Sequence, residues 1–313
     1  MATVSTVKEP PIRTLMAVSS KQELKNTEKV PRRKPVYPIS AERELARDFL
    51  SISVIIRKTA KPYLQRIAAV YGAWADENVR TDARLSMQDA VGIILEEYGD
   101  AIDDQIDVDA VTKRVNRTAR YARKISINDW KTLVKNAVDL EIDEPFYMET
   151  TEDLVNKWTY ESVQYITRYP QEYLGKIQEV ISWGYTTNQP LVNVYRRLEK
   201  VTGDTRAHVR MVARDLMGTL NCRMTQYEHE SMGVSRYRWV TKHDSRVREC
   251  HRLLDGHIFD WNNPPAQWYS TMSRGVVYTG YGHPGEAYGC RCVAAPVFDE
   301  KLIGEASSMP FFK

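Results

Sequence analysis

The amino-acid sequence predicts a mainly α-helical protein with a small C-terminal α+β module and an extended N-terminal arm. Three observations lead to this prediction. Apolar side chains recur every three or four positions across residues 41–232, as they do on an amphipathic helix. Residues 233–313 hold short alternating segments between Gly- and Pro-rich stretches, which is typical of short strands. Residues 1–40 combine prolines with few large apolar side chains, so they cannot bury enough surface to fold alone.

The N-terminal arm, residues 1–40, is basic. It holds eight Lys and Arg residues against three Glu residues, which gives a net charge of 8 − 3 = +5. Arg32, Arg33 and Lys34 form its densest cluster and are candidate contacts to a nucleic acid or a protein partner. Two interpretations remain open, an arm lying on a partner and a disordered leader.

The helical body, residues 41–232, is expected to begin at Ser40, a residue suited to cap a helix. Leu45, Phe49, Ile52 and Ile56 then share one face of the first helix. Prolines are placed at helix starts, where their missing N–H is not needed. The further helices are expected from Pro62 past Trp74, Leu85 to Ile102, Asp107 to Lys124, Asn128 to Leu140, Glu152 to Tyr169, Pro170 to Gly184, Pro190 to Val201 and Thr205 to Ser231, with a break at Pro145.

Charge is segregated inside this body. Residues 96–109 hold seven acidic residues and no basic one, whereas residues 113–124 hold six basic residues and no acidic one. Lys113, Arg117, Arg120 and Lys124 fall on one helical face, which indicates a basic stripe toward DNA or an acidic partner. The alternative is the ordinary preference of acids for helix N-termini and of bases for C-termini.

Composition excludes several classes of protein. The net charge of +3 is low for a generic cationic nucleic-acid binder. Four cysteines in 313 residues do not make a disulfide framework, so assembly in a reducing cytoplasm is expected. No apolar run approaches eighteen residues, so no membrane partner is expected.

The C-terminal module, residues 233–313, is expected to contain strands at Val234–Lys242, Val276–Tyr281 and Cys292–Phe298. It also concentrates chemistry-bearing residues. Within about fifty residues lie three of the four cysteines and four of the six histidines, namely Cys250, Cys290, Cys292, His243, His251, His257 and His283.

Three interpretations of this cluster stay open. The first is a structural zinc site, with Cys250, His251, His283, Cys290 and Cys292 as candidate ligands and zinc as the one candidate cofactor. The Cys-X-Cys spacing is tighter than the common Cys-X2-Cys pair. A disulfide from Cys250 to Cys290 or Cys292 is a related alternative.

The second interpretation is catalytic, through a Cys250–His283 nucleophile pair or a deaminase-like set of His283, Glu286 and the cysteines. The third, which we favour, is architectural. Asp244, Arg246 and Arg248 are suited to charge-assisted hydrogen bonds within a turn, and Asp255-Gly256 is a turn signal.

The same residues carry a resemblance to a known family. Trp239, Asp244-Ser245-Arg246-Val247-Arg248, His251, Leu254-Asp255-Gly256, His283-Pro284-Gly285 and Gly289-Cys290-Arg291-Cys292 occur in this order. This pattern resembles the phage head morphogenesis family typified by bacteriophage Mu protein F, over about residues 150–298. Gly289 stands where the family usually has Asn, and Arg248 where some members carry a Cys.

The resemblance implies a minor head protein of a tailed phage, present in the virion at the portal vertex and needed for head assembly or for genome packaging and retention. It implies the portal protein as partner, with the major capsid protein and double-stranded DNA as further partners, and several copies in an assembly. It implies no enzymatic activity. Two alternatives remain, a DNA-binding virion protein and a zinc-containing hydrolase or nuclease-like enzyme.

Overall fold

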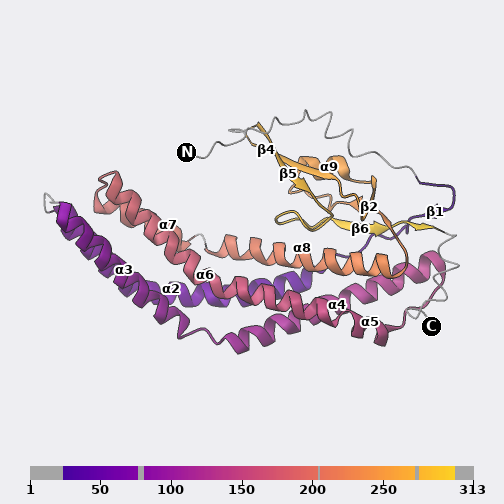
Figure 1. Cartoon of the computed structure of the whole chain (residues 1–313), viewed down its shortest axis with the longest axis horizontal. Helices are drawn as coiled ribbons and strands as arrows, with labels where there is room; N and C mark the ends of the chain where they lie inside the picture. Colours follow the sequence, from indigo (N-terminus) through magenta and orange to yellow (C-terminus); the bar gives the residue numbers. More distant parts are fainter. Residues whose placement is uncertain (1–23, 77–80, 204, 272–274, 300–313) are drawn as a thin grey trace. The chain divides into compact units, whose positions relative to one another are not determined.

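The computed structural model describes residues 24–76, 81–203, 205–271 and 275–299 (Figure 1). Residues 1–23 of the predicted arm therefore lie outside the described residues. The predicted fold class is confirmed, because long helices are followed by short antiparallel strands. The helices are α2 (Ile39–Asp76), α3 (Thr81–Asp103), α4 (Val108–Val138), α5 (Glu144–Thr150), α6 (Glu152–Thr186), α7 (Leu191–Gly203), α8 (Thr205–Ser231) and α9 (Glu249–Leu254).

Two prolines that were expected to begin new helices lie inside helices instead. Pro62 is within α2 and Pro170 is within α6. An internal proline removes one backbone hydrogen bond and costs about 3 kcal/mol. The apolar stripe nevertheless continues past each proline, as Ile67 in α2 and Tyr173 in α6 are both buried. We attribute the continuity of these helices to that burial, which outweighs the local cost of the proline.

The segments Asp107 to Lys124 and Asn128 to Leu140, expected as two helices, form the single helix α4. Ile127 and Trp130 are buried at the expected junction, so the apolar face runs through it without interruption. Pro145 was expected to break the chain, but it occupies the first turn of α5, where its missing N–H is not needed. The Asp143 carboxylate caps that helix by accepting from the Phe146 N–H at 3.2 Å.

The chain divides into two compact units that interleave along the sequence. Unit 2 comprises residues 42–118 and 156–213, and it is helical. In its core the Tyr98 hydroxyl donates to the Ile56 carbonyl at 2.6 Å, and the Tyr71 hydroxyl donates to the Gln189 carbonyl at 2.8 Å. Gly184 is required beside Tyr71, because a Cβ at this position would come within 2.9 Å of the tyrosine oxygen.

Unit 1 comprises residues 1–41, 119–155 and 214–313, and it contains every strand found in the described residues. They are β1 (Glu28–Lys29), β2 (Arg236–Val240), β3 (Ile258–Asp260), β4 (Ala266–Thr271), β5 (Gly275–Tyr281), β6 (Val293–Pro296) and β7 (Phe298–Asp299). The central strand β2 pairs antiparallel with β3 and β6, β4 pairs with β5, and β1 pairs with β7. Tyr237, Trp239 and Thr241, which alternate along and just after β2, are all buried.

The described part of the arm, residues 24–38, belongs to unit 1 and contacts its own chain. The Arg236 guanidinium binds both carboxylate oxygens of Glu28, and both side chains are buried. Asp129 accepts from the Val36 N–H at 2.8 Å and pairs with Arg33 at 2.9 Å. These contacts attach the arm at both ends of its described course.

Within the described residues, none of the helices combines the length and apolar character that a membrane span requires.

Candidate functional site

Three of the predicted ligand residues meet inside unit 1. His251 comes from α9, and Cys290 and Cys292 come from the loop of residues 282–292 between β5 and β6, which we call the Cys loop. The Nδ1 atom of His251 lies 3.6 Å from Cys290 Sγ and 3.5 Å from Cys292 Sγ. All three ligand atoms are within 4.8 Å of one another, and all three residues are buried.

The Cys loop is shaped by backbone contacts to α8. Gly218 in α8 and Gly285 in the loop approach so closely that a Cβ on Gly218 would lie 2.8 Å from the Gly285 oxygen and 2.9 Å from the Cys290 oxygen. The Asp215 carboxylate, one turn earlier, accepts from the Gly289 N–H at 2.9 Å. Gly285 and Gly289 both have positive φ, which glycine adopts at little cost. The helix therefore sets where Cys290 sits.

Gln267 of β4 orients His251 from the other side of the ring. Its Oε1 lies 3.1 Å from His251 Nε2. A Gln carbonyl oxygen only accepts, so Nε2 carries a proton, and Nδ1 faces the two thiols. The amide of Gln267 has room because residue 282 is glycine, where a Cβ would lie 2.8 Å from Gln267 Nε2. The Trp239 ring packs against His251 in a T-shaped arrangement at 5.2 Å between centroids.

The two thiols of the Cys loop are electrostatically unequal. A hydrogen bond from Cys292 lowers the pKa of Cys290, although burial acts in the opposite direction, and His251 lowers it further. The same hydrogen bond raises the pKa of Cys292, and so does burial. Burial alone would lower the pKa of His251, but hydrogen bonds with Cys250 and Cys290 raise it to about 10. The cluster thus favours one thiolate, located on Cys290.

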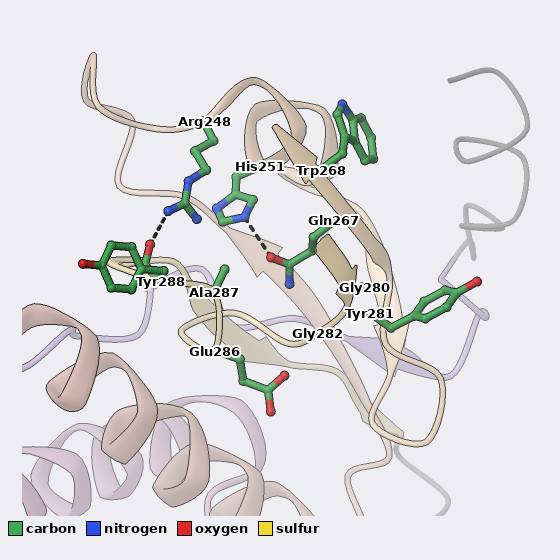
Figure 2. A pocket seen from close by; sticks show the side chains of 10 residues that line it. All are labelled: Arg248, His251, Gln267, Trp268, Gly280, Tyr281, Gly282, Glu286, Ala287 and Tyr288. Carbon is green, nitrogen blue, oxygen red and sulfur yellow. Dashed lines mark hydrogen bonds between the residues drawn. The ribbon is translucent and has the colours of Figure 1, made fainter. Parts of the chain in front are cut away.

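His251 also lines a cavity of about 640 Å³ (Figure 2). His251 and Gln267 form part of its wall, and the Arg248 guanidinium donates to the Tyr288 carbonyl at its rim. Arg248, a residue of the sequence motif, thus makes a contact to the Cys loop.

Two further predicted ligands have other surroundings. His283 lies outside the group of three, with its Nδ1 atom 2.9 Å from the Tyr237 hydroxyl and its ring beside Trp261. It also hydrogen-bonds the Trp261 backbone, and burial lowers its pKa. Cys250 is buried and hydrogen-bonds His251, but its thiol is not part of the group within 4.8 Å. The structure therefore brings together His251, Cys290 and Cys292.

The turn residues of the motif hold neighbouring segments together. Asp244 accepts from the Arg246 N–H at 3.1 Å and from the Arg291 guanidinium at 2.6 Å. Burial opposes ionisation of Asp244, but these hydrogen bonds and charges lower its pKa overall. Asp255 accepts from the Thr241 N–H at 2.7 Å, and Gly256 takes a positive φ. The Asp244–Arg291 contact joins the segment after β2 to the Cys loop, and the Asp255–Thr241 contact joins it to the turn that follows α9.

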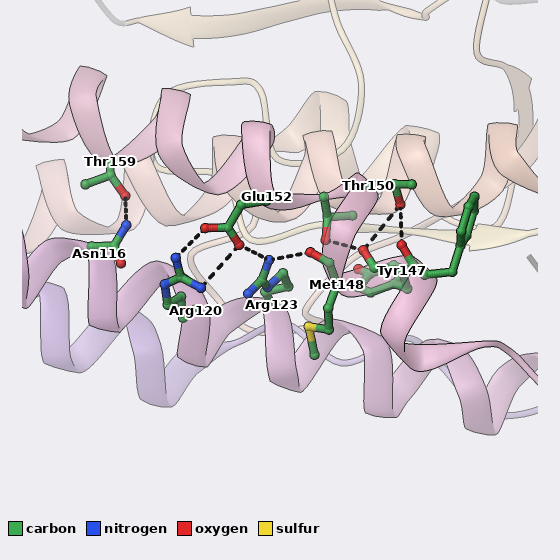
Figure 3. Close-up of polar contacts among 10 residues, drawn as sticks. Asn116, Arg120, Arg123, Tyr147, Met148, Thr150, Glu152 and Thr159 are labelled. Atoms are coloured by element: carbon green, nitrogen blue, oxygen red, sulfur yellow. Dashed lines mark hydrogen bonds and ion pairs between the residues drawn. The ribbon is translucent and has the colours of Figure 1, made fainter.

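The predicted basic contacts are all exposed, and some of them also contact another side chain. In the arm, Arg33 pairs with Asp129 and Lys34 Nζ lies 3.0 Å from His243 Nε2, while Arg32 is exposed. In α4, Arg120 binds Glu152, which also accepts from Arg123 at 2.7 Å (Figure 3). The other three residues of the predicted stripe are exposed, namely Lys113, Arg117 and Lys124.

Sequence reasoning missed three residues that build the site, Gln267, Asp215 and Gly218. Gln267 and Asp215 carry no local signal, because each acts through a contact that the tertiary fold creates. Gly218 does carry a signal. An isolated glycine within a helical pattern usually has a packing reason, and here the reason is the Cys loop.

The sequence that builds this site is similar to sequences of known proteins. A protein of Haemophilus influenzae (strain ATCC 51907 / DSM 11121 / KW20 / Rd), described as an uncharacterized protein, is 32% identical over 145 residues, which cover 46% of this chain and 30% of that protein. The chain thus matches less than a third of that relative's length. No solved structure matches. Residues 176–295 match the family described as Phage Mu protein F like protein, and this segment contains β2, α9 and the Cys loop. This match covers less than half of the chain, and over these residues it confirms the resemblance that the sequence motif predicted.

Proposed function

We propose that this protein is a minor head protein of a tailed phage that binds the portal at the head vertex and takes part in head assembly or genome packaging. The observation that carries the proposal is the family match over residues 176–295, which include the His251, Cys290 and Cys292 cluster. We infer a structural role, because the contacts of Asp244, Asp255 and His283 all join elements of the module to one another.

A surface on α7 supports binding to another protein. Leu191, Val192 and Tyr195 are exposed near the start of this helix, and Val192 is 59% exposed. Neighbouring exposed apolar side chains are typical of protein contact surfaces. We assign this surface to the portal contact of unit 2.

The first test measures where the protein is found. Gradient-purified procapsids and virions would be analysed by quantitative mass spectrometry, with the portal subunit as the internal reference. A fixed ratio of this chain to the portal subunit in virions is expected. Presence in procapsids alone would restrict the role to assembly, and absence from both particles would refute the proposal.

Val192→Glu tests the α7 surface. The substitution places a charge in the apolar surface, so we expect the ratio of this chain to the portal subunit in purified particles to fall several-fold. Val108→Glu is a matched control, because Val108 is 48% exposed and also lies in the first turn of a helix, α4. An acidic residue is favourable in the first turn of both helices, so neither variant should lose folding stability. An unchanged ratio for Val192→Glu would exclude this surface.

A DNA contact is the second candidate function, and the exposed residues Lys113, Arg117 and Lys124 of α4 favour it. Phosphate contacts release counterions, so binding to duplex DNA would weaken steeply with salt. A filter-binding titration across salt concentrations measures this. Charge reversal of the three residues should remove the binding, and lack of affinity of the unaltered protein at low salt would exclude a DNA role.

A further inference from the structure

We propose that His251, Cys290 and Cys292 bind one Zn²⁺ ion that joins α9 to the Cys loop. This inference concerns how the module is held together. It does not rest on the proposed function, because a head protein with or without zinc would still be found in particles.

The spacing of the three ligand atoms fits a tetrahedral zinc ion. Zinc lies about 2.3 Å from thiolate sulfur and about 2.0–2.1 Å from imidazole nitrogen, so a tetrahedral angle separates the sulfur and nitrogen atoms by about 3.6 Å. The two separations from His251 Nδ1 are 3.6 Å to Cys290 Sγ and 3.5 Å to Cys292 Sγ. The three atoms also share one small volume, within 4.8 Å of one another. An ion can therefore reach all three without a rearrangement of the backbone.

The surroundings of the ligands are those that a metal site needs. A histidine that binds zinc usually gives its other ring N–H to an acceptor, which fixes the tautomer. Gln267 Oε1 supplies that acceptor at 3.1 Å from His251 Nε2, and Gln267 is itself buried. The Cys292 N–H donates to Cys290 Sγ at 3.4 Å, a contact that stabilises charge on that sulfur.

The chemistry of the donors selects the ion. Two thiolates and one imidazole are soft and borderline donors that suit Zn²⁺, whereas Mg²⁺ and Ca²⁺ prefer oxygen atoms. Three ligands from the protein leave one coordination position for a solvent molecule or another group. Cys250 is not part of this ligand set, since its thiol lies outside the group within 4.8 Å.

The function of the ion follows from what it connects. His251 is on a six-residue helix, and the two cysteines are thirty-nine and forty-one residues further along the chain. Closing loops of this length through a metal ion restricts the unfolded chain, and the binding free energy adds to the stability of the module. Removal of zinc should therefore loosen α9 and the Cys loop.

The test measures zinc in the purified full-length protein by inductively coupled plasma and native mass spectrometry. We expect one zinc per chain, and loss of zinc in Cys290→Ser, Cys292→Ser and His251→Ala. Cys222→Ala is the matched control, because it removes a buried thiol that lies outside the ligand set. This control should keep zinc, and loss of zinc in it would overturn the ligand assignment.

If the ligand variants do not fold, measurements on the unaltered protein still test the site. X-ray absorption at the zinc edge of the unaltered protein should show two sulfur ligands at about 2.3 Å together with nitrogen or oxygen ligands. A chelator should lower the thermal unfolding temperature of the module, and added Zn²⁺ should restore it. Protein that lacks stoichiometric zinc after expression and refolding with Zn²⁺ would refute the site, as would a disulfide between Cys290 and Cys292.

Discussion

Glu228 shows how one buried residue affects the behaviour of unit 1. Its carboxylate accepts from the Ser126 hydroxyl at 2.6 Å and from the Tyr147 hydroxyl at 2.7 Å. Burial raises the pKa of Glu228 to about 7, against 4.5 for an ordinary Glu side chain, although the two hydroxyl hydrogen bonds act to lower it. At neutral pH this acid is therefore close to half protonated in the folded chain.

Glu228→Gln should change how stability depends on pH. The unfolded chain releases the Glu228 proton near pH 4.5 and the folded chain near pH 7, so the unaltered protein loses stability as pH rises between these values. Gln mimics the protonated acid and removes this loss. We expect the variant to be more stable at pH 8, by up to about 3 kcal/mol, and nearly unchanged at pH 5.

Urea unfolding at pH 5 and pH 8 measures this difference. Glu230→Gln is the control, because Glu230 is exposed on the same helix and bonds only locally to Gln226 at 2.8 Å. A stability gain of Glu228→Gln that is equal at both pH values would contradict the raised pKa.

At the scale of elements, the close approach of α8 to the Cys loop positions the two cysteines. The approach depends on Gly218, because a Cβ there meets backbone oxygens of Gly285 and Cys290, which cannot rotate away as a flexible side chain can. Helix packing and the geometry of the candidate zinc site are therefore coupled.

Gly218→Ala should destabilise unit 1 although alanine favours helices. The new methyl group needs a backbone shift, for which overpacked sites cost about 1–3 kcal/mol. The thermal unfolding temperature and the zinc content per chain should both fall. Gly175→Ala in α6 is the matched control, since nothing lies within 4 Å of its Cβ position, and it should be neutral or stabilising by up to about 1 kcal/mol. Equal unfolding temperatures for the two variants would show that the Cys loop can shift to accept the methyl group without loss of stability.

Strand β1 pairs with β7 over two residues, and its Glu28 side chain also forms a buried ion pair with Arg236. Glu28→Ala leaves the Arg236 guanidinium buried without its carboxylate, which typically costs about 3–5 kcal/mol. Lys25→Ala is the comparison. The Lys25 ammonium is exposed and lies 3.8 Å from the Glu28 carboxylate, a long and weak ion pair, so its removal should lower the free energy of unfolding by less than about 1 kcal/mol. Chemical denaturation gives the free energy of unfolding of both variants. A large loss in Glu28→Ala alone would show that the contacts of the arm stabilise unit 1.

At the scale of the whole molecule, the two units are built from interleaved segments. The arm, which the sequence suggested as a separate element, shares unit 1 with the C-terminal module. A truncation that keeps unit 1 intact must therefore retain the chain from Lys25 onward, where the described contacts of the arm begin.

Two truncations separate folding from assembly. Removal of residues 1–23 keeps the Glu28–Arg236 pair and the Asp129 contacts, so we expect an unchanged unfolding temperature. Removal of residues 1–38 deletes those partners and should lower the unfolding temperature by several degrees. If residues 1–23 reach a partner in the head, the shorter truncation will be folded yet depleted from purified particles. A stable protein after the longer truncation would show that the arm contributes little to folding.

The sequence by itself determined the helical class, the strand-bearing C-terminal module and the family motif. These depend on the period of apolar residues and on residue types at short spacing, both of which are local properties. The continuity of α2 across Pro62 and of α6 across Pro170 was not predictable locally, because buried contacts made elsewhere in the chain offset the cost of each proline.

The tertiary structure alone decided which of the candidate ligands meet. Seven Cys and His residues occur in one region of the sequence, five of them candidate ligands, but spacing did not separate His251 from His283. Their positions depend on β2, α8 and β4, which bring Tyr237 to His283 and Gln267 to His251. Such contacts join residues far apart in sequence, and their free energy comes from burial and hydrogen bonding that exist only after the chain has folded.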